Sequence, residues 1–202
     1  SAALEYLRDP ARKDQPFALC VGFVAPHFPF IVPEPYFSMY YPDKTDLPDN
    51  PPGHLDDLPP AARRLRQAFG FVDFSDEQVL RARAAYYGLI SYVDAKIGRL
   101  LDALEEQGLV ESTVVVHTSD HGELLGEHGL WRKMSFYEQS ARVPLQISWP
   151  GRIPAGRRFG GAVSLVDVTA TILELAGVPE EATQLMAPDG DSLLPLMRGE
   201  GM

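Results

Sequence analysis

The chain of 202 residues has only one cysteine, Cys20, so no disulfide can form within it and cysteine usage does not reveal the redox compartment. No apolar run approaches the roughly 18 residues of a membrane-spanning helix, and no targeting segment is visible. With 18 Lys and Arg against 28 Asp and Glu, the net charge is −10. A nucleic-acid partner needs a basic surface. We therefore expect neither a nucleic-acid nor a membrane partner, and the localisation stays open between cytoplasm and periplasm.

The length suits one sizeable core, and the apolar content of 45% is ordinary for a globular protein. Residues 1–9 predict a short helix that ends at Pro10. The apolar run from Phe17 to Val24 predicts a buried strand. Residues 26–60 hold ten of the eighteen prolines, which excludes regular helix and central strand. A loop this long is typical of a functional rim, and we give its histidine, His54, no role.

A long helix is predicted to follow this loop. Ser75 and Gln78 form a capping-box pattern, and apolar residues then recur every three or four positions as far as Gly108. Charged side chains on the other face, Arg81 and Arg83 among them, are expected to be solvated. Further along, residues 143–149 and 163–166 predict strands, and residues 167–176 predict a helix that Gly177 ends.

The central stretch begins with a β-branched run, Thr113 to Val116, which favours a strand buried on both faces of a parallel sheet. Ligands bind outside the carboxyl ends of such strands. Asp120 and His121, found at that end, are therefore candidate metal ligands, although Asp-His-Gly alone fits a simple turn equally well. Lys133 follows one loop later, and such a loop can return a lysine to the same strand end.

This stretch resembles the sulfatase family of alkaline-phosphatase-like hydrolases, near the choline-sulfatase and phosphonate-monoester-hydrolase branch. The matching strings are Thr118-Ser119-Asp120-His121-Gly122-Glu123, Gly126-Glu127-His128-Gly129-Leu130-Trp131 with Lys133, Tyr137-Glu138 and Arg142-Val143-Pro144-Leu145. The resemblance implies an α/β fold, an alkaline-phosphatase-like sheet with helices on both faces. The chain is expected to be its C-terminal part. Residues 1–202 are then one partial catalytic domain, with a rim loop at 26–60, a scaffold helix at 75–108 and a metal-strand and active-site region at 112–149.

The resemblance also implies roles for individual residues. Asp120 and His121 are expected to bind a divalent metal, Lys133 to contact an ester oxygen, and His27 of Pro26-His27 to contact the ester. Ca²⁺ is the metal that the family favours, and Mn²⁺ is a rival because a histidine ligand is softer than oxygen. His128 either lines the substrate pocket or holds a turn.

This chain departs from the family pattern in two respects. Many family members carry a lysine before the Pro-His pair, where this chain has Ala25. Sulfatases use a formylglycine made from Cys or Ser in a Cys/Ser-x-Pro-x-Arg motif, and Cys20 is followed by neither the proline nor the arginine. We assign no nucleophile to this chain, expect the formylglycine in an N-terminal part, and expect the chain alone to be inactive.

Three functions remain open at this point. The first is metal-assisted hydrolysis of a small anionic sulfate monoester by the full-length protein. The second is hydrolysis of phosphonate monoesters or phosphodiesters, which uses nearly the same site. The third is a non-catalytic binding or structural protein that lacks the nucleophile half. A flank left exposed by the missing half is expected to be apolar and to drive self-association.

Overall fold

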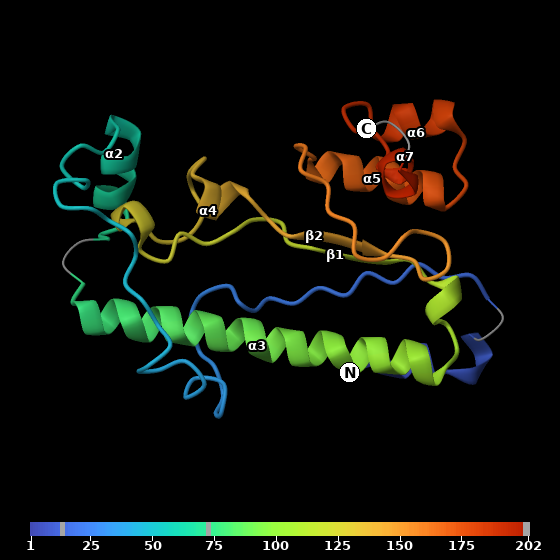
Figure 1. Cartoon of the computed structure of the whole chain (residues 1–202), viewed down its shortest axis with the longest axis horizontal. Helices are drawn as coiled ribbons and strands as arrows, with labels where there is room; N and C mark the ends of the chain where they lie inside the picture. Colours follow the sequence, from blue (N-terminus) through green and yellow to red (C-terminus); the bar gives the residue numbers. More distant parts are fainter. Residues whose placement is uncertain (13–14, 72–73, 200–202) are drawn as a thin grey trace. The chain divides into compact units, whose positions relative to one another are not determined.

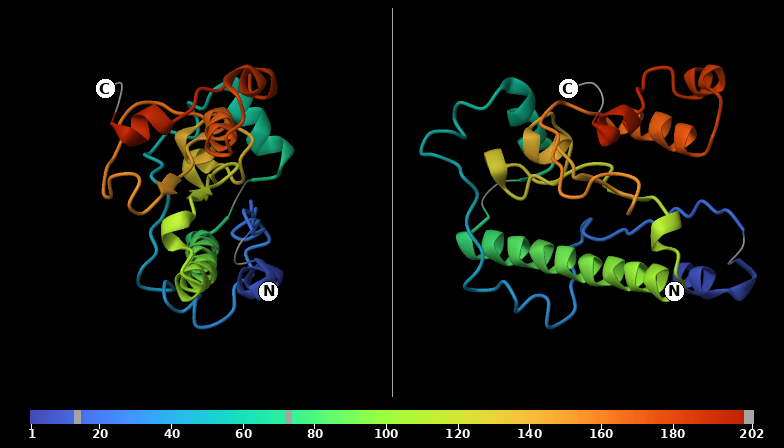
Figure 2. Two further views of the ribbon diagram at one scale, coloured as in Figure 1. Left: turned by 90° about the vertical axis from the view of Figure 1, so that its right-hand side faces the viewer. Right: turned by 45° about the vertical axis from the view of Figure 1, so that its right-hand side comes forward.

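The computed structural model describes residues 1–12, 15–71 and 74–199, which divide into two units of the chain (Figures 1 and 2). The first unit contains Ser1–Leu109 and His121–Pro144, and the second contains Val110–Asp120 and Leu145–Met202. None of the helices in the described residues combines the length and the apolar character needed to cross a membrane.

The longest element of the first unit is α3 (Asp76–Glu106), as the apolar periodicity predicts. At its start the Ser75 side chain accepts a hydrogen bond from the Gln78 amide, and the Gln78 side chain accepts one from the Ser75 amide. At its end Gly108 has φ of 67°, and the amides of Gly108 and Leu109 donate back to carbonyls of the last turn. Both predicted ends of the helix are confirmed.

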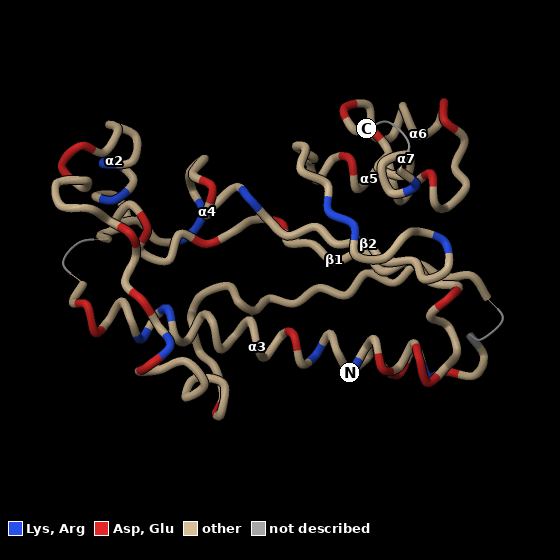
Figure 3. The backbone as a smooth tube through the Cα atoms, viewed as in Figure 1, with Lys and Arg blue, Asp and Glu red and all other residues tan. Residues whose placement is uncertain are grey.

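Charged residues follow the length of α3. Figure 3 shows acidic residues at both ends of the helix and residues of both signs between them. The acidic residues of the first turn, Asp76 and Glu77, lie where the helix dipole favours negative charge. Near the other end, Glu106 accepts hydrogen bonds from Arg8 of α1 (Ala2–Arg8), with a shortest distance of 2.8 Å. The ion pair joins the first helix of the chain to α3.

The other helical segments of the first unit are short. α1 ends before Pro10, as predicted, and buries Leu4 and Leu7. The remaining segments are η1 (Pro10–Arg12), α2 (Pro60–Ala68), η3 (Glu127–Gly129) and α4 (Glu138–Ala141). The Pro-rich segment before α2 is irregular, as its proline content predicts, until Pro59 and Pro60 start the helix.

The predicted buried strand from Phe17 to Val24 is wrong. These residues lie outside any strand, and most of their side chains are exposed, with Val24 at 84%. Cys20 is exposed as well. A strand needs a neighbour to form a ladder, and the described residues contain one sheet, of two strands from other segments. The apolar pattern therefore indicates a segment that could pair in a sheet, but the described part of the chain contains no strand that pairs with it.

The second unit is built on β1 (Val115–Thr118) and β2 (Leu145–Ser148), which pair antiparallel with Val115 opposite Ser148. Both predicted strands form, but β1 begins two residues after the start of the predicted run, and β2 lies within the predicted residues 143–149. The prediction of a parallel arrangement buried on both faces is wrong for this pair, because the partner runs antiparallel and β1 is only half-buried. η2 (Val110–Ser112) precedes β1.

The described residues of the second unit also form α5 (Leu165–Leu175), α6 (Glu180–Met186) and α7 (Leu194–Arg198). The strand predicted at residues 163–166 is wrong, because Ser164 is the N-cap of α5 and forms a capping box with Asp167. A short apolar run does not distinguish a strand from the first turn of a helix. The predicted end of this helix is confirmed, since Gly177 has φ of 76° directly after it.

Two glycines of α3 provide a matched test of its packing. A Cβ at Gly88 would lie 2.8 Å from the Tyr36 carbonyl oxygen, whereas a Cβ at Gly98 would meet nothing within 4 Å. We expect Gly88→Ala to lower the free energy of unfolding by about 1–3 kcal/mol through overpacking. Gly98→Ala should raise it by about 0.5–1 kcal/mol, because alanine favours helix. Urea unfolding of both variants measures the difference, and equal effects would contradict the packing of Tyr36 on this helix.

Candidate active site

The chain folds back on itself between Gly122 and Lys133, a segment that we call the return loop. The amide of Leu124 donates to the Arg132 carbonyl at 2.9 Å, and the amide of Gly126 donates to the Leu130 carbonyl at 2.8 Å. These bonds close the loop, so that its two ends lie beside each other. The backbone that follows Asp120 and His121 is thereby brought back towards its starting point.

The return loop holds three non-glycine residues in the left-handed region. Their φ angles are 49° for Leu125, 56° for His128 and 71° for Arg132. Such residues are uncommon, cost of order 1–3 kcal/mol each and persist only where the surroundings enforce them. They cluster at functional sites, so this strain marks the loop as a candidate site independently of any motif.

Apolar packing anchors the loop to α2. Leu124 and Leu130 are completely buried, and they belong to one cluster with the buried residues Leu58 before α2, Ala62 within it and Phe71 after it. The segment from residue 61 to 71 was not assigned to any element from the sequence. It provides the platform on which the loop packs.

Ser140 of α4 joins the two ends of the loop. The Gly122 amide donates to its carbonyl at 2.8 Å, and its hydroxyl donates to the Lys133 carbonyl. Gly122 is required at this position, because a Cβ there would lie 2.0 Å from the Gln139 carbonyl oxygen. The close approach of α4 therefore fixes Lys133 beside the start of the loop.

Three of the residues predicted for the site lie together in the first unit. The Lys133 Nζ lies 2.5 Å from His121 Nε2, and the rings of His121 and His27 have centroids 6.2 Å apart. His121 Nδ1 lies 2.7 Å from the Gly122 carbonyl oxygen. A carbonyl oxygen only accepts, so Nδ1 carries the proton and the lone pair of Nε2 faces the lysine.

His27 is held by its neighbour Phe28. Its Nδ1 donates to the Phe28 carbonyl at 2.7 Å, and the two rings stack with centroids 4.3 Å apart. The Arg132 guanidinium lies over the other partner of this stack, 4.1 Å from the centroid of Phe28. The residue before Lys133 thus contacts the residue after His27, which links the two sides of the site.

Asp120 is the fourth predicted residue. It belongs to the second unit, directly precedes His121 in the chain, and its carboxylate accepts from the Ser119 hydroxyl at 3.5 Å. A carboxylate and a neutral imidazole are suitable ligands for a divalent metal, and the Nδ1–carbonyl bond of His121 is the usual support for such a ligand. The described residues contain no group of three or more His, Cys, Asp or Glu that could hold a metal. A metal site at Asp120 and His121 therefore stays a prediction.

His128 lies against the Pro-rich loop. Its Nδ1 is 2.8 Å from His54 Nε2, its ring stacks on Tyr137 at 3.8 Å, and its amide donates to the Asn50 side chain at 2.7 Å. The Asn50 side chain also donates to the Gly126 carbonyl at 2.9 Å. His54, which received no role from the sequence, is thus a partner of a candidate site residue. Its signal was absent from the sequence because the two histidines are 74 positions apart.

The pKa of His128 is lowered from its usual 6.5, first because burial disfavours the charged ring and second because of the neighbouring His54. The unfolded chain then binds more protons than the folded one just below pH 6.5, so the free energy of unfolding should rise with pH there. Thermal unfolding between about pH 5 and pH 7.5 measures this dependence. We expect a smaller slope for His128→Gln, and an unchanged slope would contradict the assignment.

One string in the chain fits the nucleophile pattern by its letters, namely Ser148-Trp149-Pro150-Gly151-Arg152, and the assignment of no nucleophile must account for it. Ser148 is the last residue of β2 and lies opposite Val115 in the ladder. It follows Asp120 and His121 in the chain, whereas the family motif belongs to the part before them. The absence of a nucleophile from this chain therefore stays a prediction.

Comparison with known proteins identifies the class. The model of the family described as Sulfatase matches residues 1–178, and the chain belongs to that family. A choline-sulfatase of Rhizobium meliloti is 37% identical over 187 residues, which are 92% of this chain and 36% of that protein. An arylsulfatase of Clostridium perfringens is 36% identical over 190 residues, 90% of this chain and 38% of that protein. The chain thus spans less than two fifths of the length of these relatives.

Solved structures agree with this assignment. A phosphonate monoester hydrolase from Silicibacter pomeroyi matches with a TM-score of 0.83 and 34% identity, over 98% of this chain and 40% of that one. A sulfatase-like protein from Bacteroides fragilis matches with a TM-score of 0.72 and 27% identity, over 100% of this chain and 40% of that one. These neighbours confirm the fold class predicted from the sequence, a part of an alkaline-phosphatase-like α/β domain.

Proposed function

We propose that this chain provides the ester-binding side of a sulfuric ester hydrolase, which acts together with a nucleophile carried elsewhere in the complete protein. The observation that carries the proposal is the grouping of His27, His121 and Lys133 in the first unit. The family membership supports a hydrolase. Since the chain spans 36–40% of its relatives, the activity and the substrate belong to the complete protein and are proposed for it alone.

The chemistry of a sulfate monoester explains these residue types. The substrate is an anion, and charge on its non-bridging oxygens must be stabilised as the ester bond breaks. In this proposal Lys133 donates to an ester oxygen as a point charge. His27, whose Nδ1 is engaged by Phe28, uses Nε2 toward the ester or the leaving oxygen. The substrate is expected to be a small anionic ester, and the proposal leaves its organic part open.

Asp120 and His121 would hold a divalent metal, which supplies Lewis-acid stabilisation of the ester oxygens when bound. Ca²⁺ is the first candidate because the resemblance to the family implies it. Mn²⁺ is the second because one of the two donors is an imidazole nitrogen. The further oxygen ligands that a hard cation requires are expected outside this chain, as is the formylglycine nucleophile. By this proposal the chain alone is inactive.

The second candidate function is hydrolysis of phosphonate monoesters or phosphodiesters. It is favoured by the match to the phosphonate monoester hydrolase, with a TM-score of 0.83. A phosphonate ester presents similar non-bridging oxygens, so Lys133 and His27 would take the same roles. The third candidate, a non-catalytic binding protein, would leave the grouping of these side chains without use.

The activity of the complete protein decides between these functions. We expect turnover of a generic aryl sulfate that exceeds turnover of an aryl phosphonate ester. Asp120→Ala and Lys133→Ala should each lower kcat/KM by a factor on the order of 10² or more, because each removes charge stabilisation. Preference for the phosphonate would establish the second candidate function. Absence of turnover of both esters, with a nucleophile motif present, would contradict the sulfatase proposal for generic substrates.

Ser148→Ala is the matched control for this experiment. Because Ser148 belongs to the β2 ladder, we expect its removal to leave kcat/KM within about threefold, an effect of well under 1 kcal/mol on the barrier. A loss as large as that of Lys133→Ala would identify Ser148 as the nucleophile. The assignment of the nucleophile to another part of the protein would then be wrong.

The exposed segment from Phe17 to Val24 predicts a property of the isolated chain. Leu19 and Val21 are 36% exposed and Phe23 is 39% exposed, in an extended segment without a strand partner among the described residues. Unpaired extended backbone with apolar side chains promotes association. We expect the 202-residue chain to self-associate in light scattering, and Val21→Lys to reduce this. A monodisperse monomer without the substitution would contradict the prediction.

A further inference from the structure

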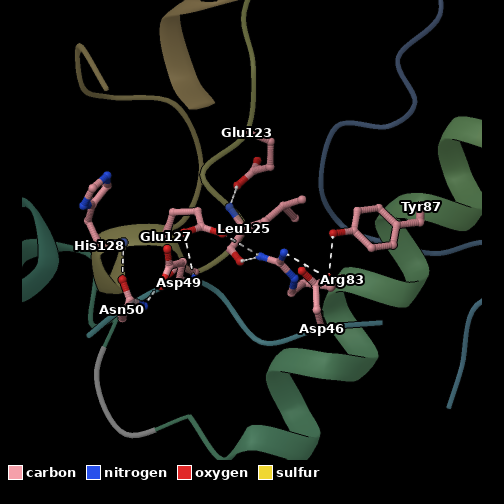
Figure 4. Close-up of polar contacts among 10 residues, drawn as sticks. Asp46, Asp49, Asn50, Arg83, Tyr87, Glu123, Leu125, Glu127 and His128 are labelled. Carbon is pink, nitrogen blue, oxygen red and sulfur yellow. Dashed lines mark hydrogen bonds and ion pairs between the residues drawn. The ribbon is translucent and has the colours of Figure 1, made fainter. Parts of the chain in front are cut away.

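Arg83 is the most deeply buried cation of the described chain. Its side chain is 6% exposed, although it lies on α3 among residues that the sequence predicted to face solvent. Its guanidinium donates to the Leu125 carbonyl at 2.9 Å, to Glu127 Oε1 at 3.2 Å and to Asp46 Oδ1 at 3.3 Å (Figure 4). The prediction of a solvated Arg83 is therefore wrong.

The environment of Arg83 keeps it charged. Burial alone disfavours the cation, but the neighbouring Tyr87, Asp46 and Glu127 more than offset this and raise the pKa of Arg83. The pKa of Asp46 is lowered: its partial burial acts in the opposite direction, and the charge of Arg83 outweighs it. Tyr87 also donates to Asp46, at 3.3 Å. Arg83 is therefore a buried cation with three acceptors. Burial of this cation without its acceptors would cost several kcal/mol.

The atoms that Arg83 holds belong to the strained part of the return loop. Leu125, whose carbonyl accepts from Arg83, has φ of 49°. Glu127 accepts from Arg83 through one oxygen and from the Asp49 amide through the other, at 3.1 Å. Figure 4 shows the Arg83 guanidinium close to Leu125 and Glu127 of the loop and to Asp46 of the Pro-rich segment. One cation thus joins three segments that are distant in sequence.

A short path leads from these contacts to Lys133. The amide next to Leu125, that of Leu124, donates to the Arg132 carbonyl at 2.9 Å. Glu123 accepts from the Arg132 amide at 2.5 Å and from the Leu125 amide at 3.4 Å. Arg132 directly precedes Lys133. The backbone that Arg83 binds is therefore hydrogen-bonded to the residue directly before Lys133.

We propose that Arg83 is a positioning residue of the active site, which holds the return loop in the conformation that places Lys133 against His121. This proposal rests on the function proposed above for Lys133. Arg83 acts on these two side chains indirectly, through its hydrogen bonds to the Leu125 carbonyl and Glu127. The two terminal nitrogens of the guanidinium donate in fixed directions, Nη1 to Leu125 and Glu127 and Nη2 to Asp46, and a lysine reproduces only part of this arrangement.

The first test is steady-state kinetics of the complete protein. We expect Arg83→Met to lower kcat by about 10–100-fold, because a displacement of a catalytic group by about 1 Å has an effect of this size. KM should change much less, since a misplaced Lys133 affects the transition state more than ground-state binding. Arg83→Lys should recover part of the loss. Values of kcat are normalised to the folded fraction, so that a purely structural role would leave them unchanged.

Arg81→Met is the matched control on the same helix. Arg81 is two positions away and forms an exposed ion pair with Glu77 at 2.9 Å. Its removal should leave kcat within about twofold, since exposed pairs contribute little. Equal kcat for Arg83→Met and Arg81→Met, after normalisation, would overturn the proposal.

Hydrogen exchange separates this proposal from the proposed function. We expect Arg83→Met to increase exchange of the Leu124 and Gly126 amides at least tenfold, while the amides of α1 stay unchanged. If the complete protein hydrolyses neither ester, the proposed function fails, and faster exchange of these two amides would still show that Arg83 orders the loop. Unchanged exchange would overturn the positioning role whatever the activity.

Discussion

The tight return of the chain from Gly122 to Lys133 is the constraint on which the candidate site depends. A lysine 12 positions after a histidine reaches its ring only if the backbone between them reverses sharply. This reversal places three non-glycine residues in the left-handed region, which is unfavourable in isolation. The surrounding structure must therefore supply the free energy that the loop itself lacks.

Three kinds of contact supply that free energy. Leu124 and Leu130 bury apolar surface against α2, and each fully buried leucine contributes about 1.5–3 kcal/mol. Asn50 binds the loop through its amide, donating to Gly126 and accepting from His128. Arg83 donates to the Leu125 carbonyl and to the carboxylate of Glu127, whose charge it balances. Apolar burial fixes the position of the loop, and the directional polar contacts select the backbone conformation, because dispersion forces alone have little angular preference.

The parts that could be predicted from the sequence are those whose causes are local. The ends of α3 depend on Ser75, Gln78 and Gly108, all within a few residues of the boundary they create. The strand at residues 17–24 and the burial of Arg83 depend on segments far away in the chain, so local pattern misjudged both. One signal for Arg83 was present: it occupies the apolar stripe of α3, four positions after Val79 and three before Tyr86. A cation inside such a stripe indicates a distant acceptor. His54 carried no comparable signal.

The contact of Lys133 with His121 also limits how the two residues can act together. The single lone pair of His121 Nε2 can accept from the lysine or bind a metal, and one use excludes the other because Nδ1 is already protonated toward Gly122. If His121 holds a metal as proposed, this ring nitrogen no longer accepts from Lys133. The ammonium group of Lys133 is then available to an anionic ester, in a chain whose net charge is −10. The contact with His121 seen in the structure and the proposed contact with an ester are therefore alternative uses of the same lysine.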